Sequence, residues 1–321
     1  MPAIKDLSFE NPLLLGPMAG VTDSAFRSVC RRFGAAGCYT EMVSAKALTY
    51  HDKKTRELLF IAPEEHPCGA QIFGSDPSVC AEAAVMALEI SGADFLDINM
   101  GCPVPKIVNN GEGSALMRDP AAAERLIAAV RKKISVPLTV KFRKGFDEDH
   151  CNAVEFARMA ESAGADALCV HGRTRRQMYA GKSDFSIIEQ VKQAVSVPVI
   201  ASGDMFTGED AANALRRGID FVMVARGAQG DPLVFRRMLA ALENRPCPPQ
   251  DLADLLAIMQ QHIALMCERK GEARAIPEAR KHILWYLKGV AGAKPYKLRF
   301  AQVASRREIA ELCGEMLRQL A

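Results

Sequence analysis

The pattern that decides the fold is contained in one stretch, Ala163-Gly164-Ala165-Asp166-Ala167-Leu168-Cys169-Val170-His171. A helical pattern ends here at Gly164, because glycine readily adopts the left-handed conformation that follows a helix. The short apolar run after it is typical of a strand buried on both faces. The same joint recurs as Ser91-Gly92-Ala93-Asp94 and as Arg217-Gly218-Ile219-Asp220. The chain is therefore predicted to repeat a unit of one helix and one strand.

Eight short apolar runs fit this pattern, and longer helical patterns separate them. The expected strands are Leu13–Leu15, Cys38–Met42, Cys68–Phe73, Asp94–Met100, Val136–Phe142, Asp166–His171, Val197–Gly203 and Asp220–Arg226. The clearest helical patterns are Pro77–Ser91, Pro120–Ile134, Cys151–Ala163 and Gly208–Arg217. Alternating strands and helices predict a parallel sheet. Eight units without a Gly-x-Gly-x-x-Gly fingerprint favour a closed (β/α)8 TIM barrel over a doubly wound sheet.

The repeat stops at Arg245, and a different organisation follows. Residues 244–250 contain three prolines, which cannot continue a helix, so this segment is predicted to be a linker. Only helical patterns come after it, at Asp251–Lys270, Pro277–Val290 and Arg306–Leu320. We therefore expect two domains, a catalytic barrel over residues 1–245 and a small helical domain over residues 246–321.

Composition narrows the class of protein. The chain has 321 residues, 49% of them hydrophobic, and no apolar run reaches the roughly 18 residues of a membrane span. The N-terminus lacks the charged-then-apolar order of a signal peptide, so we expect a cytoplasmic protein without a membrane partner. The 10 cysteines form no Cys-x-x-Cys pair, and no histidine has zinc-finger spacing from two of them. We expect no structural metal, no disulfide framework and a monomer.

Positive charge is concentrated near the C-terminus. Residues 246–321 hold 12 Lys and Arg against 8 Asp and Glu, and residues 271–307 hold 9 against 2. A local basic face is typical of a protein with an anionic partner, although a solvated helical surface gives the same count.

The C-terminal ends of barrel strands carry the side chains that face substrate. The seventh and eighth strands end in Ser202-Gly203-Asp204 and Ala225-Arg226-Gly227, where barrels usually bind a phosphate group. Gln71, Lys141 and His171 point inward from the third, fifth and sixth strands, and they can hydrogen-bond the edge of a flat ring. A phosphate site next to groups that bind a flat ring indicates a mononucleotide such as FMN. Lys141 could instead serve as a Schiff-base lysine in an aldolase.

Cys102 is the strongest catalytic candidate. It follows the fourth strand in Asn99-Met100-Gly101-Cys102-Pro103, at the start of a loop rich in glycine and proline that could close over a ligand. A thiol with a pKa near ~8.5 is mostly protonated at neutral pH and can donate a proton to a substrate carbon. From position alone a nucleophilic role, which needs an adjacent base, stays open.

Three motifs are similar to those of a known family. Pro17-Met18-Ala19-Gly20-Val21-Thr22-Asp23, Asp97-Ile98-Asn99-Met100-Gly101-Cys102-Pro103 and His171-Gly172-Arg173-Thr174-Arg175 resemble the tRNA-dihydrouridine synthases, most closely the bacterial B type. The resemblance covers the barrel and continues into the tail, where Arg280-Lys281-His282, Trp285-Tyr286 and Lys288-Gly289 look like the helical tRNA-binding domain of that family.

This resemblance implies a specific reaction. Family members bind FMN, NADPH reduces the FMN, hydride passes to C6 of a uridine in tRNA, and the cysteine protonates C5. Carried over by motif, the residues that contact the flavin would be Pro17, Met18, Ala19, Gln71, Lys141 and His171. Those that hold its phosphate would be Ser202, Gly203, Asp204, Ala225 and Arg226. Those near the uracil would be Asn99, Arg143 and Arg173, while Arg175, Arg280 and Lys281 would meet tRNA phosphates.

Two positions depart from the family pattern, and several questions stay open. Ser202 stands where the family usually has Asn, and Ala225 stands where it usually has Gly, which leaves the side-chain contact of Ser202 open. One alternative is a flavin oxidoreductase of a free small molecule, like the dihydroorotate dehydrogenases. Another is an RNA-binding protein whose barrel has lost catalysis. Trp285 could stack on a base or pack in a core. The uridine position and a preference for tRNA over ribosomal RNA are not encoded in these motifs.

Overall fold

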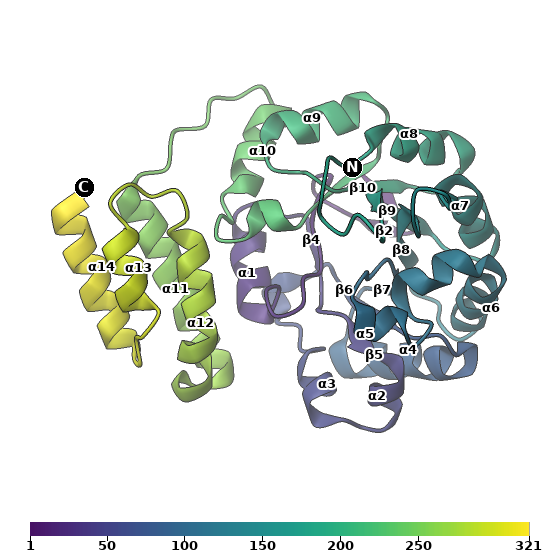
Figure 1. Cartoon of the computed structure of the whole chain (residues 1–321), viewed down its shortest axis with the longest axis horizontal. Coiled ribbons are helices and arrows are strands. Elements are labelled where there is room, and N and C mark those ends of the chain that lie inside the picture. Colours follow the sequence, from purple (N-terminus) through teal and green to yellow (C-terminus); the bar gives the residue numbers. More distant parts are fainter. Residues whose placement is uncertain (321) are drawn as a thin grey trace.

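Eight parallel strands form a closed barrel in the computed structural model, which describes residues 1–320 (Figure 1). The strands are β3 (Leu13–Leu15), β4 (Gly37–Tyr39), β6 (Cys68–Phe73), β7 (Phe95–Met100), β8 (Leu138–Gly145), β9 (Ala167–Thr174), β10 (Val199–Ser202) and β11 (Phe221–Val224). They follow the order β4-β3-β11-β10-β9-β8-β7-β6, and pairing of Cys38 with Cys68 joins β4 to β6. The predicted (β/α)8 barrel is confirmed.

Helices surround the barrel and begin at residues that the sequence marks clearly. The main ones are α1 (Ser24–Arg32), α4 (Pro77–Ser91), α6 (Pro120–Arg131), α7 (Ala153–Ser162), α8 (Phe185–Ala194), α9 (Gly208–Arg216) and α10 (Val234–Leu242). Asp76 and Asp119 cap α4 and α6, and each is followed by proline at the first helical position, where a missing N–H is harmless. Gly92 ends α4 at φ +64°, as the repeated joint predicts.

Aromatic side chains fill the N-terminal end of the barrel. Phe9, Tyr39, Phe95 and Phe221 are buried there and pack edge to face, with ring centroids 5.0 to 6.4 Å apart. A hairpin of β1 (Ala3–Ile4) and β2 (Leu7–Ser8), which the sequence analysis did not predict, precedes Phe9. Because this end is packed shut, polar chemistry is confined to the opposite end of the strands.

Some short elements escaped prediction. They include β5 (Val43–Ser44), which adds to β6, α2 (Ala45–Thr49), α3 (Lys53–Glu57), α5 (Pro105–Val108) and α13 (Lys294–Phe300). The second tail helix was expected to begin at Pro277, but α12 (Glu272–Tyr286) begins five residues earlier and runs through this proline. A proline this close to the helix N-terminus removes only one of the early hydrogen bonds, so the helix continues.

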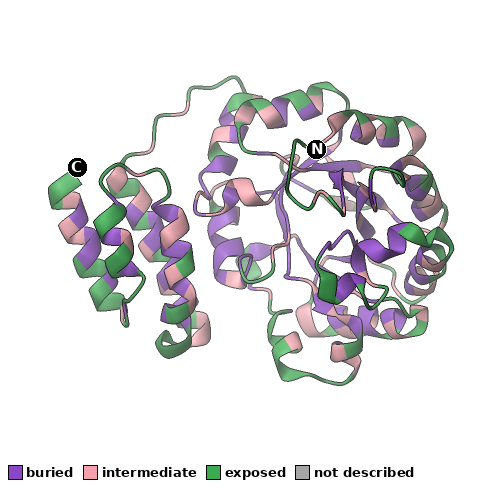
Figure 2. Ribbon diagram, viewed as in Figure 1, coloured by how far each residue is buried: buried purple, intermediate pink, exposed green. Residues whose placement is uncertain are grey.

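Four tail helices stack beside α1, and the linker arches over from α10 to reach them (Figure 1). They are α11 (Leu252–Lys270), α12, α13 and α14 (Arg306–Leu320). Their buried apolar residues form a core that also includes Ala25 and Val29 of α1 and Leu233, so the tail and the barrel share an apolar contact. Figure 2 shows buried residues on α1 as well as on the tail helices. Within residues 1–320, none of the helices has the combination of length and apolar character that crossing a membrane requires.

Candidate active site

A cavity of about 390 Å³ opens at the C-terminal ends of the barrel strands. Its size lies within the range of roughly 300 to 1,000 Å³ that is typical of small-molecule sites. Every residue predicted to hold FMN lines it: Pro17, Met18, Ala19, Gln71, Lys141, His171, Ser202, Gly203, Asp204, Ala225 and Arg226. Cys102, Asn99 and Arg143 line it too. Seven strands, which are far apart in the sequence, therefore direct these side chains into one space.

Cys102 is held firmly in the cavity wall. Its side chain is buried, its backbone N–H donates to Asn99 Oδ1 at 2.8 Å, and its carbonyl accepts from the Ser114 hydroxyl at 2.9 Å. Burial raises the pKa of the Cys102 thiol, and the Val104 N–H and the positive charges of Arg143 and Lys141 offset this only in part. The thiol is therefore protonated at neutral pH, as a proton donor must be.

Arg143 ties the Cys102 loop to the loop after β9. Its Nε donates to the Gly101 carbonyl at 2.8 Å, and its Nη1 donates to the carbonyls of Thr174 and Met178, both at 2.9 Å. Burial lowers the pKa of Arg143 to about 10, so this side chain stays cationic at neutral pH. A fixed cation beside Cys102 can bind an electronegative oxygen of a substrate ring.

His171 provides a polar atom that lacks a partner in the protein. Its Nδ1 is buried and makes no hydrogen bond to any of residues 1–320. Burial, together with the charges of Lys141, Arg143, Arg173 and Arg226, lowers the pKa of His171 well below its usual range, so the imidazole is neutral. An unpaired buried nitrogen is costly unless a ligand meets it. His171 therefore indicates a ligand with a polar edge at this side of the cavity.

Close packing of the neighbouring loops requires glycine at the ends of β10 and β11, beside Arg226. Gly203 has φ +108°, and a Cβ there would lie 2.5 Å from Ser183 Oγ, while a Cβ on Gly227 would lie 2.2 Å from the Met205 carbonyl oxygen. The Arg226 guanidinium lies 4.7 Å from the Tyr179 ring centroid and 3.2 Å from Asp204 Oδ1. Glycine backbone beside an arginine is a common phosphate site in barrels.

Two predicted substrate residues lie outside this cavity. Arg173 is buried, and its Nη2 donates to Asp204 Oδ2 at 2.6 Å and to the Gly181 carbonyl at 2.6 Å. Burial alone would raise the pKa of Asp204, but the hydrogen bond and charge of Arg173 lower it below its usual value. Arg175 lies over the Phe146 ring, 5.4 Å from its centroid. In this structure Arg173 joins the loop after β10 to the loop at Gly181, and Arg175 packs on Phe146.

Sequence reasoning missed two aromatic residues at the cavity mouth. Tyr179 is 54% exposed, Phe206 is 45% exposed, and both line the cavity with Arg226 between them. Neither follows the strand ends directly, and both lie in loops where no periodic pattern marks a functional position. Large exposed aromatics beside a cavity were the available signal, and only the folded structure reveals exposure.

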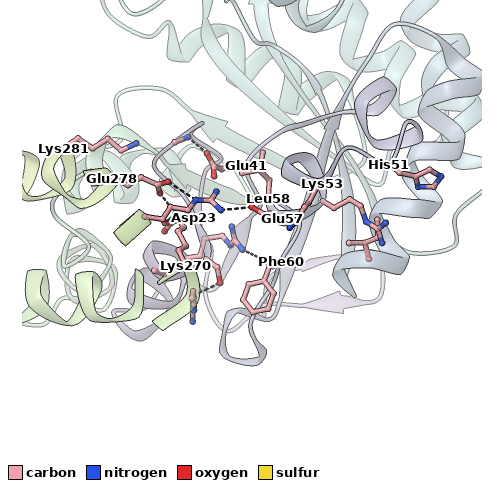
Figure 3. Close-up of a pocket in the computed structure, with 18 residues that line it drawn as sticks. Asp23, Glu41, His51, Lys53, Glu57, Leu58, Phe60, Lys270, Glu278 and Lys281 are labelled. Carbon is pink, nitrogen blue, oxygen red and sulfur yellow. Dashed lines mark hydrogen bonds and ion pairs between the residues drawn. The ribbon is translucent and has the colours of Figure 1, made fainter. Parts of the chain in front are cut away.

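A second hollow of about 890 Å³ lies between the barrel and the tail (Figure 3). Lys270 of α11 reaches Asp23 at 2.5 Å and Glu278 at 2.7 Å. Burial opposes ionisation of Asp23, but the charges of His262 and Lys270 lower its pKa to about 2. These contacts fasten the tail to the start of α1. We refer to this hollow, bounded by α1, α3, α11 and α12, as the groove.

The groove also carries cations that are not used in such contacts. Lys53, Arg56 and Lys281 line it, and none of them joins an ion pair within the described part of the chain. Lys281 Nζ lies only 3.2 Å from where a Cβ on Gly20 would be, and the neighbouring Ala19 lines the cavity. The groove thus adjoins the cavity through one loop.

The other two tail residues singled out by sequence have structural contacts. Arg280 does not line the groove, and its Nε and Nη2 donate to the Val303 carbonyl at 3.0 and 2.8 Å. Trp285 is half-buried and packs against the barrel core, with its ring 5.1 Å from that of His282. Core packing, one of the two roles considered for Trp285, is what the structure shows.

One buried cluster, Cys38, Glu65 and Cys68, has donor atoms close enough together for a metal ion. The Glu65 carboxylate is already the ion-pair partner of Arg27 at 2.5 Å, and it also accepts from the Ala62 N–H. Burial raises the pKa of the Cys38 thiol well above its usual value, so this thiol remains protonated. The cluster is accounted for by this ion pair and by packing.

Comparison with known proteins identifies relatives along nearly the whole chain. The family described as dihydrouridine synthase (Dus) matches residues 14–321. The tRNA-dihydrouridine synthase B of Pseudomonas aeruginosa is 41% identical over 309 residues, which cover 93% of this chain and 92% of that protein. That of Shewanella oneidensis is 41% identical over 280 residues, or 87% of each chain. A probable tRNA-dihydrouridine synthase of Rhizobium leguminosarum is 43% identical over 288 residues, 89% of this chain and 88% of the relative.

Proposed function

Because the chain belongs to the dihydrouridine synthase family, we propose that it reduces specific uridines in tRNA to 5,6-dihydrouridine, with FMN as cofactor and NADPH as reductant. The observation that carries the proposal is Cys102, a buried and protonated thiol in the same cavity as the residues expected to hold a flavin. We assign the chemistry to residues 1–245 and tRNA binding to residues 246–321 together with the adjoining barrel loops.

The cavity fits FMN on its own chemistry. The unpartnered His171 Nδ1, with Lys141 and Gln71, would meet the polar edge of the ring system. Gly203 and Gly227 line the cavity at this end, where their backbone would meet the phosphate group, and Arg226 would pair with its charge. Ser202 and Ala225 replace the usual Asn and Gly at this end, and backbone N–H groups carry much of such a site, so both are tolerated. When bound, reduced FMN would supply the hydride for C6 of the uracil, and NADPH would supply the electrons for the next turnover.

The protein supplies the proton and the orientation. Cys102 would donate its thiol proton to C5, on a loop whose position Asn99 and Arg143 hold. Asn99 and Arg143 would also hydrogen-bond the uracil edge, because both line the cavity beside Cys102. Arg143 stays cationic through neutral pH, so it stabilises negative charge that develops on the ring oxygens.

The groove is where we expect the tRNA backbone to lie. A uridine inside a folded tRNA must be splayed out to enter the cavity, and this costs a few kcal/mol. Phosphate contacts compensate without reading sequence, and Lys53, Arg56 and Lys281 are available for them in the groove. An enzyme that reduces a free small molecule does not need a groove with unpaired cations next to its cavity, so this feature favours tRNA as the substrate.

The test is direct. The purified full chain should be yellow, take up FMN, and form dihydrouridine in an unmodified tRNA transcript when NADPH is added, as measured by mass spectrometry of the nucleosides. A folded chain that cannot bind FMN would overturn the proposal. Reduction of free pyrimidines at a rate that matches or exceeds the rate on tRNA would favour the small-molecule alternative.

A further inference from the structure

A continuous chain of hydrogen bonds runs beneath the cavity to the Cys102 loop. Gln71 Nε2 donates to Asp97 Oδ2 at 2.6 Å, and Asn99 Nδ2 donates to Gln71 Oε1 at 3.1 Å. Asn99 Oδ1 then accepts the backbone N–H of Cys102 at 2.8 Å and that of Gly101 at 3.1 Å. Gln71 and Asn99 line the cavity, whereas Asp97 is fully buried and does not.

The groups at the two ends of this chain, the Cys102 backbone N–H and the Asp97 carboxyl, fix which atom donates and which accepts in every bond. A backbone N–H can only donate, so the Asn99 amide must turn its oxygen to Cys102 and its NH2 group to Gln71. Gln71 must then turn its oxygen to Asn99 and its own NH2 group away from it. The group beyond Gln71 therefore has to accept, and an ionised carboxylate is a side chain that only accepts. Asp97 meets that requirement.

Strand register brings these groups together. Gln71 of β6 lies opposite Asp97 of β7, and Asp97 lies opposite Thr139 of β8, whose hydroxyl donates to Asp97 Oδ1. A buried carboxylate without a counter-ion contact is expensive to keep, and nothing in the proposed reaction uses Asp97 directly. Its hydrogen bond to Gln71 indicates a structural role beneath the cavity.

We propose that Asp97 is a positioning residue that orients the Gln71 and Asn99 amides and thereby holds the Cys102 loop in place. The positioning itself is a property of the fold, and only its catalytic meaning rests on the proposed function.

The surroundings of Asp97 have opposing effects on its pKa. Burial raises its pKa to about 7, against the hydrogen bonds from Thr139 and Gln71 and the charge of Lys141. The other titratable groups that face it are Tyr39 of β4 and Cys169 of β9, and burial raises the pKa of both, so they stay neutral. Lys141 is therefore the cation among the groups that face Asp97. The chain of bonds requires an acceptor oxygen toward Gln71, and the carboxylate form that predominates at pH 8 supplies one.

The experiment measures how well the Cys102 loop is held, without depending on turnover. Iodoacetamide labelling of the purified full chain at pH 8 is followed at Cys102 by peptide-resolved mass spectrometry. Asp97→Leu leaves Gln71 Nε2 without an acceptor, and an unsatisfied buried donor costs enough to speed labelling about tenfold or more. Asp97→Asn can still turn an amide oxygen to Gln71, so it should restore the slow wild-type rate. Thr139→Val, which removes only the donor on the far side of Asp97, is the matched control and should also label slowly.

Several outcomes discriminate. Wild-type labelling in Asp97→Leu, or equally fast labelling in Asp97→Asn and Asp97→Leu, would overturn the positioning role. If Asp97→Leu fails to fold, which labelling at the buried Cys30 and Cys313 would reveal, Gln71→Met breaks the same chain one residue nearer to Cys102 and should give the same increase. The two proposals can fail separately. If Cys102 labels faster in Asp97→Leu than in wild type, but wild type forms no dihydrouridine, the positioning role stands and the proposed function is rejected.

Discussion

The cavity and the groove are neighbouring hollows, but their side chains are held in different ways. In the cavity Cys102, Asn99 and Arg143 are buried, the Asn99 amide oxygen accepts the backbone N–H of Cys102, and Arg143 donates to the Gly101 carbonyl. In the groove Lys53 and Lys281 are exposed and make no ion pair within residues 1–320. Rigid, desolvated groups suit chemistry, where a small displacement is costly, whereas mobile surface cations suit binding of a polyanion. Changes in the cavity should therefore reduce rates sharply, and changes in the groove should weaken affinity modestly.

The largest effect is expected at Cys102. Cys102→Ala removes the proton donor and should lower dihydrouridine formation by about 10²- to 10⁴-fold, the usual contribution of general acid catalysis. FMN content and NADPH oxidation should stay at the wild-type level, because the thiol does not hold the flavin. The measurement is single-turnover dihydrouridine formation with pre-reduced enzyme. Cys151→Ser, an exposed thiol outside the cavity, is the control. Normal turnover by Cys102→Ala would remove the proton-donor role.

The second prediction concerns the buried carboxyl beneath the cavity. Burial raises the pKa of folded Asp97 to about 7, above its unfolded value, so its contribution to stability is fully present below the unfolded pKa and is lost as the pH rises through 7. Asp97→Asn does not titrate, so its stability does not fall in this way as the pH rises. Relative to wild type, the variant should gain about 2 to 3 kcal/mol of unfolding free energy between pH 5 and pH 8. Urea unfolding of both proteins with excess FMN at the two pH values checks it. If the difference in unfolding free energy between the two proteins is the same at pH 5 and pH 8, the pKa of Asp97 in the folded protein is not raised.

The third prediction tests Arg226, at the end of the cavity where we propose that the FMN phosphate binds. Arg226→Ala should weaken FMN binding about 10- to 100-fold, since hydrogen bonds to charged groups contribute about 1.5 to 3 kcal/mol. Arg216→Ala removes an exposed arginine of α9 that pairs with Glu209 and is the matched control. The quenching of FMN fluorescence on titration with the flavin-free chain measures both. Equal affinity of the two variants would show that Arg226 does not meet the phosphate.

These two hollows also differ in how far sequence could predict them. The repeated helix-to-strand joints located the barrel, and barrel geometry requires residues at strand ends such as Gln71, Lys141 and His171 to share one cavity. The groove has no comparable rule. Of its three cations that are unpaired within residues 1–320, only Lys281 lies in the basic stretch 271–307, whereas Lys53 and Arg56 were not singled out, because their position beside α11 and α12 depends on how the tail packs against the barrel.

Individual side chains show where that reasoning stops. Arg173 lies in a motif at a strand end, yet it turns toward Asp204 because the loop near Gly181 folds back over it. Arg280 and Lys281 are adjacent in sequence and lie on different faces of α12, so Arg280 meets the Val303 carbonyl while Lys281 reaches the groove. Asp97 reads as one more polar residue in a strand, and only the directions of its hydrogen bonds give it a role.

The smallest effect is expected at Lys281, and it is the sharpest test of the groove. Lys281→Glu should weaken tRNA binding about 3- to 10-fold at low salt and reduce the slope of log affinity against log salt by about one, as loss of one phosphate contact does. FMN affinity and single-turnover chemistry at saturating tRNA should not change, because Lys281 lines the groove and not the cavity. Lys133→Glu makes the same charge change on the outer surface of the barrel and corrects for net charge. If both variants bind tRNA equally well, the polyanion does not lie in the groove. If Lys281→Glu slows chemistry at saturation instead, the groove and the cavity act as one site, and the contrast between rigid chemistry and mobile binding fails.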